Sequence, residues 1–151
     1  MLVAALGSAK LASAVFLLVP LSIAGGMLGL VLFGLPFSIP AAVGFIALSG
    51  ISVLTGVVYV SDYKERVKAG AELSAAAWES ARATARAVLT TELIAAIGFI
   101  PMAMSSGAGA EVQRPLALVV VFGLLTGTLI GQLLLPTLVP WLQRFQFSFG
   151  K

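Results

Sequence analysis

The sequence predicts an all-α membrane protein with four transmembrane helices and one amphipathic helix at the membrane interface. Of its 151 residues, 60% are hydrophobic and only 10% are charged, whereas soluble proteins average about 25% charged residues. No charged residue occurs from Leu11 to Ser61. Water-soluble helices keep a polar face, and this run is long enough for two helices of the ~20 residues that cross a bilayer core. Both observations predict a chain embedded in lipid.

The uncharged run divides into two spans at a tight turn. The first span is expected over residues 15–34 and the second over residues 39–60, with Gly34-Leu35-Pro36 between them. Glycine and proline in sequence mark a turn rather than a continuing helix. Pro20 lies inside the first span, where it frees one backbone carbonyl and is expected to bend the helix.

Two further spans follow a charged central segment. They are expected over residues 88–105 and 116–138, and the short loop between them carries Glu111 and Arg114. Residues 71–87 are rich in alanine, contain no glycine or proline, and place four charged residues near helical spacing: Glu72, Glu79, Arg82 and Arg86. This pattern predicts a helix that lies along the interface with its charged stripe in water. A simple connector and a moving coupling helix both fit the pattern.

The distribution of lysine and arginine predicts the orientation of the chain. Five of these residues lie between positions 64 and 86, whereas Arg114 alone lies on the opposite side. Cytoplasmic loops carry an excess of lysine and arginine. The central segment and both termini are therefore predicted to be cytoplasmic, because four spans return the chain to the side where it started.

The absence of cysteine and histidine narrows the function classes. The sequence has no thiolate or imidazole ligand, and Ser-His and Cys-His catalytic constellations cannot form. Its positive residues lie at membrane edges rather than in a basic stripe with aromatic stacking positions, which argues against nucleic-acid binding. We therefore expect no bound metal, no cofactor, no enzymatic activity and no nucleic-acid partner.

Small residues form stripes on three of the predicted spans. Helices associate in lipid mainly by close backbone approach, since burying apolar surface gives little advantage there. The glycines expected at helix contacts are Gly25 and Gly29 on the first span, Gly50 and Gly56 on the second, and Gly123, Gly127 and Gly131 on the fourth.

Glu92 is the one ionisable residue placed clearly inside a predicted span, and such residues are candidate functional sites. A buried carboxyl group there could carry a proton, whereas an interfacial one would reach back to cytoplasmic water. Glu92 lies about one turn, ~5.4 Å, inside the predicted span, which favours the interfacial interpretation. Ser52 and Thr55, with Thr126 and Thr128, could line a polar path, although such hydroxyls often bond their own helix backbone.

Three strings of residues resemble a known family of membrane transporters. They are SIPAAVGFIALSG at Ser38–Gly50, GFIPMA at Gly98–Ala103, and GAGAEVQRPLA at Gly107–Ala117. With the segments around them, these strings closely resemble the C-terminal membrane part of the RND superfamily, and within it the heavy-metal efflux branch. The resemblance extends from about Ser8 to Trp141.

This resemblance implies a fold, a function and partners. Such transporters have twelve membrane helices and two large extracytoplasmic domains, and they work as homotrimers driven by proton influx, with a periplasmic adaptor and an outer-membrane channel. The four spans then look like helices nine to twelve, with Met1–Gly7 as the end of helix eight, in the bacterial inner membrane. The chain would be the C-terminal membrane part of a heavy-metal efflux pump, not expected to transport without the N-terminal half.

The chain also departs from the family pattern. Where members place Asn or a Glu-Thr pair, the second span has Leu54-Thr55, and Glu92 stands where members usually carry a small apolar residue. We therefore take Thr55 and Glu92 as the candidate proton path, as lining and titrating group respectively. The alternative function is a free-standing four-helix scaffold, or a remnant subunit without transport activity.

Overall fold

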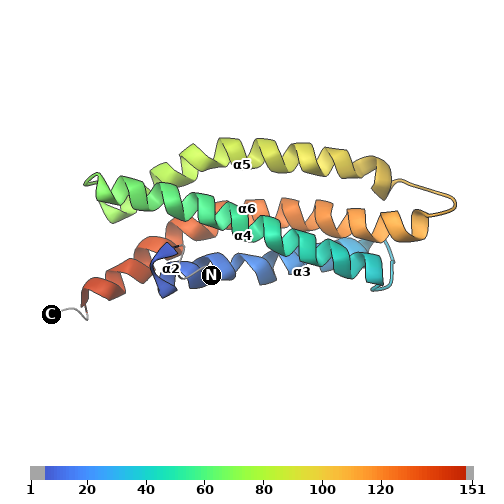
Figure 1. The fold of residues 1–151 in the computed structure, drawn as a ribbon, viewed down its shortest axis with the longest axis horizontal. Helices are drawn as coiled ribbons and strands as arrows, with labels where there is room; N and C mark the ends of the chain where they lie inside the picture. Colours follow the sequence, from blue (N-terminus) through green and yellow to red (C-terminus); the bar gives the residue numbers. More distant parts are fainter. Residues whose placement is uncertain (1–5, 149–151) are drawn as a thin grey trace.

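The computed structural model describes residues 6–148, with the side chains of residues 6–142, and it is a bundle of long helices (Figure 1). The helices are α2 (Ala9–Phe16), α3 (Leu18–Leu32), α4 (Ile39–Lys68), α5 (Leu73–Ala103) and α6 (Ala110–Ser148). Four segments are long and apolar enough to cross a membrane: Ala9–Leu32, Ile39–Lys68, Leu73–Ala103 and Ala110–Leu142. The predicted all-α membrane fold is confirmed. The expectation for Met1–Gly7 falls largely outside the described residues.

The first span is interrupted by its proline. Helix α2 ends at Phe16 and α3 begins at Leu18. Pro20 has no N–H to donate to the Phe16 carbonyl, and its ring crowds that carbonyl. The interruption at Leu17 is the local result, and it agrees with the bend expected from Pro20.

The amphipathic segment and the third span form one helix rather than two elements. Helix α5 continues from Leu73 to Ala103 without interruption and passes through Pro101 near its end. No glycine or proline lies near residue 87, so nothing in the backbone ends the helix between the two predicted elements. The break lies before it, where Gly70 adopts a φ of +95°, a conformation open to glycine at no steric cost.

Helix α6 packs against α3, α4 and α5 and forms the centre of the bundle. Figure 1 shows the turn after α3 and the loop between α5 and α6 at one end. The opposite end gathers α2, the α4–α5 turn and the end of α6 (Figure 1). We call these the loop end and the terminal end.

Two apolar clusters fill the interior, one toward each end. The cluster at the terminal end includes residues of α2, α4, α5 and α6, among them Leu11, Val15, Tyr59, Tyr63, Ala77 and Val139. The cluster at the loop end includes residues of α3, α4 and α6, among them Leu30, Phe45, Leu48, Val119 and Leu124. Four polar residues described below lie between the buried residues of the two clusters along α4 and α6, namely Ser52, Thr55, Thr128 and Gln132.

Polar contacts connect the helices at the terminal end. The Arg66 guanidinium contacts the Asp62 carboxylate at 2.7 Å and the Glu79 carboxylate of α5 at 3.1 Å. The Tyr59 hydroxyl donates to the Ala77 carbonyl at 3.0 Å, also between α4 and α5. Partly exposed ion pairs contribute about 0.2–1 kcal/mol each, so these contacts mainly fix the position of α5 on α4.

Six of the seven glycines expected at helix contacts lie against another helix. A Cβ at Gly29 would come within 2.9 Å of the Phe122 side chain, and one at Gly56 within 2.6 Å of Val15. The remaining contacts are Gly25 with Thr126 and Phe122, Gly123 with Leu48, Gly127 with Ser22, and Gly131 with Leu18. The expectation for Gly50 is not met within this chain: Gly50 is exposed, with no atom within 4 Å of its Cβ position, because it lies on the outer side of α4.

We expect Gly25→Ala to destabilise the bundle by about 1–3 kcal/mol, the usual cost of overpacking. The added methyl group would meet Thr126 and lie 3.0 Å from the Phe122 carbonyl oxygen, which cannot move aside as a flexible side chain would. Thermal unfolding in detergent micelles, followed by circular dichroism, measures the change. Gly50→Ala is the matched control, and alanine's better helix propensity should leave it neutral or up to about 1 kcal/mol more stable. Equal destabilisation by both would contradict the packing described above.

Candidate functional site

Glu92 lies inside the bundle. The residue is only 8% exposed, and it shares the inward face of α5 with Thr84, Val88 and Ala96. At 1.5 Å rise per residue, Glu92 lies about 16 Å from the loop end of α5, and Thr55 about 24 Å from the loop end of α4. Both depths fall within a ~30 Å hydrocarbon layer. The structure therefore favours the buried alternative for Glu92 over the interfacial one.

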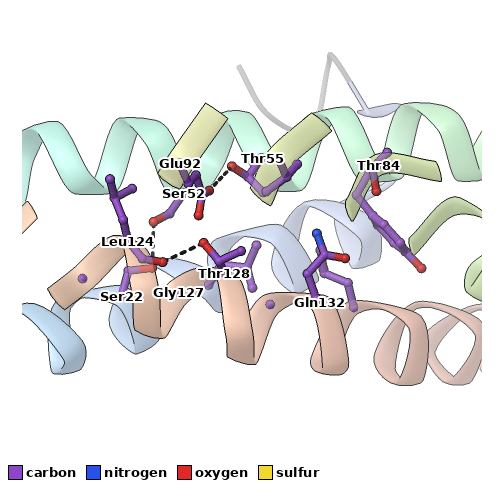
Figure 2. A pocket seen from close by; sticks show the side chains of 15 residues that line it. Ser22, Ser52, Thr55, Thr84, Glu92, Leu124, Gly127, Thr128 and Gln132 are labelled. Carbon is purple, nitrogen blue, oxygen red and sulfur yellow. Dashed lines mark hydrogen bonds between the residues drawn. The ribbon is translucent and has the colours of Figure 1, made fainter. Parts of the chain in front are cut away.

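Thr55 and Glu92 contact each other. The Thr55 hydroxyl donates a hydrogen bond of 3.0 Å to the Glu92 Oε1 oxygen, and this bond connects α4 to α5. Figure 2 shows the two side chains pointing toward one another. The two residues proposed for the proton path are 37 positions apart in sequence, and the fold brings them together.

A second buried pair connects α3 and α4. The Ser52 and Ser22 hydroxyl oxygens lie 2.7 Å apart (Figure 2), and both residues are buried. Ser22 lies over Gly127, where a Cβ would collide with its hydroxyl group. Sequence reasoning missed Ser22, although a lone serine three residues before a Gly-xxx-Gly stripe is a detectable signal.

The two pairs border one small cavity between α3, α4, α5 and α6. Its free volume of about 20 Å³ is enough for one water molecule. The cavity lies between the two apolar clusters, so it forms a polar layer in the middle of the bundle. The polar side chains that line it are Ser22, Ser52, Thr55, Tyr59, Thr84, Glu92, Thr128 and Gln132. Thr84 and Gln132 were not among the sequence candidates.

Several hydroxyl groups of this layer also bond their own helix. Thr84 donates to the Ser80 carbonyl and Thr128 to the Leu124 carbonyl, each at 2.7 Å, and Figure 2 shows the second bond. Lining the cavity and bonding the backbone are therefore compatible roles for one hydroxyl. Thr126 does not line the cavity, since its side chain packs on Gly25.

A bundle of membrane-spanning helices with a carboxyl group at membrane depth is typical of membrane transport proteins, in which intramembrane ionisable residues mark ion pathways. Residues 1–142 match the AcrB/AcrD/AcrF family. The chain belongs to this family, and its resemblance to the heavy-metal branch of RND transporters is confirmed by the relatives that follow.

Two curated relatives are metal-resistance proteins. The chain is 51% identical over 134 residues to the nickel and cobalt resistance protein CnrA of Cupriavidus metallidurans, covering 89% of this chain and 12% of that protein. It is 48% identical over 147 residues to the nickel-cobalt-cadmium resistance protein NccA of Alcaligenes xylosoxydans, covering 97% of this chain and 14% of that protein. The chain thus spans about one eighth of the length of these relatives.

A solved structure has the same helix arrangement. The crystal structure of a heavy metal efflux pump, in its second crystal form, superposes with a TM-score of 0.82 at 36% identity. The match covers 95% of this chain and 14% of that protein. The four helices therefore have the arrangement of one segment of a much larger membrane protein.

We expect the Thr55–Glu92 hydrogen bond to give a measurable coupling energy in a double-mutant cycle. The variants are Thr55→Val, Glu92→Leu and the double variant, and the free energies of unfolding in micelles are compared. Hydrogen bonds between membrane helices give coupling energies of about 0.6 kcal/mol on average and up to about 1.7 kcal/mol. Thr90→Val is the control for Thr55→Val, because the Thr90 hydroxyl bonds the Arg86 carbonyl of its own helix and is exposed. The control cycle pairs Thr90→Val with Glu92→Leu. A coupling energy no larger than in that control would contradict the Thr55–Glu92 hydrogen bond.

Proposed function

We propose that this chain is the C-terminal membrane part, helices nine to twelve, of a proton-driven RND pump that exports heavy-metal cations. The observation that carries the proposal is 48–51% identity, over 89–97% of the chain, with two proteins named for nickel and cobalt resistance. Identity at that level across nearly all of the chain favours a shared role in the pump. The chain itself binds no metal and catalyses no reaction in this proposal, because it lacks the ligand and nucleophile sets noted above.

The proposed location is the bacterial inner membrane, with the terminal end of the bundle in the cytoplasm. The terminal end carries Lys64, Arg66 and Lys68, and the positive-inside rule assigns such an end to the cytoplasm. Trp78 and Trp141 are half exposed near this end and border the same surface hollow. Tryptophan is enriched at membrane–water interfaces, so their position supports a membrane boundary near this level.

The proposed partners are the lipid bilayer and the other parts of the pump. In the most apolar 18-residue stretch of α5, only 17% of the residues are buried inside the bundle, compared with 44% in the corresponding stretch of α6. The exposed apolar side chains of α5 include Leu93, Ile94, Ile97 and Ile100, and they require lipid or a neighbouring helix. We assign this face to the N-terminal half of the pump, in a homotrimer that connects to a periplasmic adaptor and an outer-membrane channel.

The proposal predicts that this chain can replace its counterpart in a working pump. In CnrA, the aligned C-terminal segment is exchanged for residues 1–142, and the chimera is expressed with its native partner subunits in a nickel-sensitive strain. We expect the chimera to restore most of the nickel tolerance given by the parent. Growth in graded nickel and nickel efflux from loaded cells are the two measurements.

A matched chimera that carries Gly123→Leu should fail, because the added side chain would occupy the position of Leu48 at the α4–α6 contact. Membrane fractions are checked for equal amounts of both chimeras. A correctly inserted chimera without nickel tolerance would overturn the metal-efflux proposal. If the chain also forms a stable assembly alone and does not associate with the rest of the pump, the scaffold alternative replaces it.

A further inference from the structure

The polar layer around Glu92 has more hydrogen-bond acceptors than donors. The hydroxyl protons of Thr84 and Thr128 go to their own helix carbonyls, and that of Thr55 goes to Glu92 Oε1. A hydroxyl that has donated its proton presents only lone pairs to other groups. The second carboxyl oxygen, Glu92 Oε2, is buried and has no hydrogen-bond partner among the described residues. The remaining donors that border the cavity are the amide of Gln132 and the Ser22 hydroxyl, and neither bonds Glu92 Oε2.

Among the residues whose side chains are described, no positive side chain faces Glu92 from the helices around it. Helix α3 has no charged residue, the charges of α4 begin at Asp62, and α6 has none from Pro115 to Leu142. On α5, Arg82 and Arg86 are exposed. The other titratable group that borders the cavity is Tyr59, whose hydroxyl donates to the Ala77 carbonyl.

A carboxylate without a counter-charge at this depth is strongly destabilised relative to the protonated group. The carboxylate therefore has no positive neighbour, and its Oε2 oxygen has no donor among the described residues. A proton bound at Oε2 removes the charge and turns that oxygen into a donor. The remaining space, about 20 Å³, accepts one water molecule as the partner of the protonated group.

We propose that Glu92 is an exchangeable proton-binding site that lies wholly within these four helices, with one cavity water as the second partner of its carboxyl group. This inference deepens the proposed function and rests on its proton-coupling part. It assigns a protonation site to α5 of this chain itself, where each bound proton neutralises one carboxylate.

An apolar surface groove lies directly beside Glu92. This groove of about 150 Å³ between α5 and α6 is lined by apolar residues together with Glu92, Leu124 and Thr128. The same three residues also line the interior cavity. These three side chains therefore separate the cavity from the groove, and the Glu92 carboxyl group is the titratable group among them.

The oxygen ligands that line the cavity favour a monovalent cation. One carboxyl group and neutral hydroxyl oxygens provide a single negative charge and no soft ligand, whereas sites for transition metals use imidazole or thiolate ligands. Sodium is the competing monovalent cation, since it also accepts oxygen ligands. The experiment must therefore separate a proton from sodium.

Dicyclohexylcarbodiimide, which adds to protonated carboxyl groups in apolar surroundings without loss of an atom, is the probe. The whole chain in bacterial membrane vesicles is treated with it at a series of pH values, and the modified residue is identified by mass spectrometry. We expect labelling at Glu92 that falls as the pH rises and does not change when sodium chloride replaces potassium chloride. Glu92→Gln should lose the labelling, whereas Glu111→Gln, at the exposed start of α6, should keep it.

Thr55→Val tests the role of the hydrogen bond. A donor to a carboxyl oxygen favours the ionised form, so without Thr55 the labelling of Glu92 should persist to higher pH than in the parent chain. Thr90→Val should leave the pH dependence unchanged. Loss of packing alone would change the amount of folded chain and not the pH at which labelling falls.

Three results would overturn the inference. The first is no labelling of Glu92 in a chain with the parent's helical content. The second is labelling that does not depend on pH. The third is protection of Glu92 by sodium at constant pH, which would identify a sodium site. The labelling is read without any transported metal. A chimera that fails in nickel tolerance but still labels at Glu92 therefore refutes the metal-efflux proposal alone.

Discussion

The close approach of α3 to α6 is the contact on which the rest of the structure depends. Gly25 and Gly29 of α3 lie against Thr126 and Phe122 of α6, and Gly127 of α6 lies beneath Ser22. In lipid this approach is stabilised by packing and by hydrogen bonds between helices, because burying apolar surface gives little there. The same approach brings Ser22 to Ser52 on α4. A larger residue at any of these glycines would therefore disturb both the helix contact and the polar layer next to it.

The polar layer can exist at membrane depth because apolar clusters cover it on both sides. The cluster with Leu48 and Val119 lies toward one end and the cluster with Tyr59 and Val139 toward the other. In such a low-dielectric environment hydrogen bonds are stronger, and an unpaired polar group costs more. Each described hydroxyl that borders the cavity accordingly uses a neighbouring helix or its own backbone. Glu92 Oε2 is the exception, and the proton-binding proposal explains this exception.

Sequence patterns predicted the four spans well because spans depend on local properties, namely long uncharged segments and the turn residues that separate the helices, Gly34-Leu35-Pro36, Gly70 and Gly107–Gly109. They did not predict that residues 73–103 form one helix, since a change from amphipathic to apolar character does not itself end a helix. The Thr55–Glu92 pair was also beyond prediction as a pair. The rotation of each helix about its own axis is set by packing, and the same reason turns Gly50 outward while Gly56 contacts Val15.

Helix α5 combines the least buried apolar surface of the four spans with the one carboxyl group buried among them. Its inward side is connected to α4 by the Thr55–Glu92 and Tyr59–Ala77 hydrogen bonds and by the Arg66–Glu79 ion pair. Its outward side carries Ile94 and Ile97, which are exposed. Whatever covers the outward side therefore contacts the same continuous helix that carries Glu92 on its inward side.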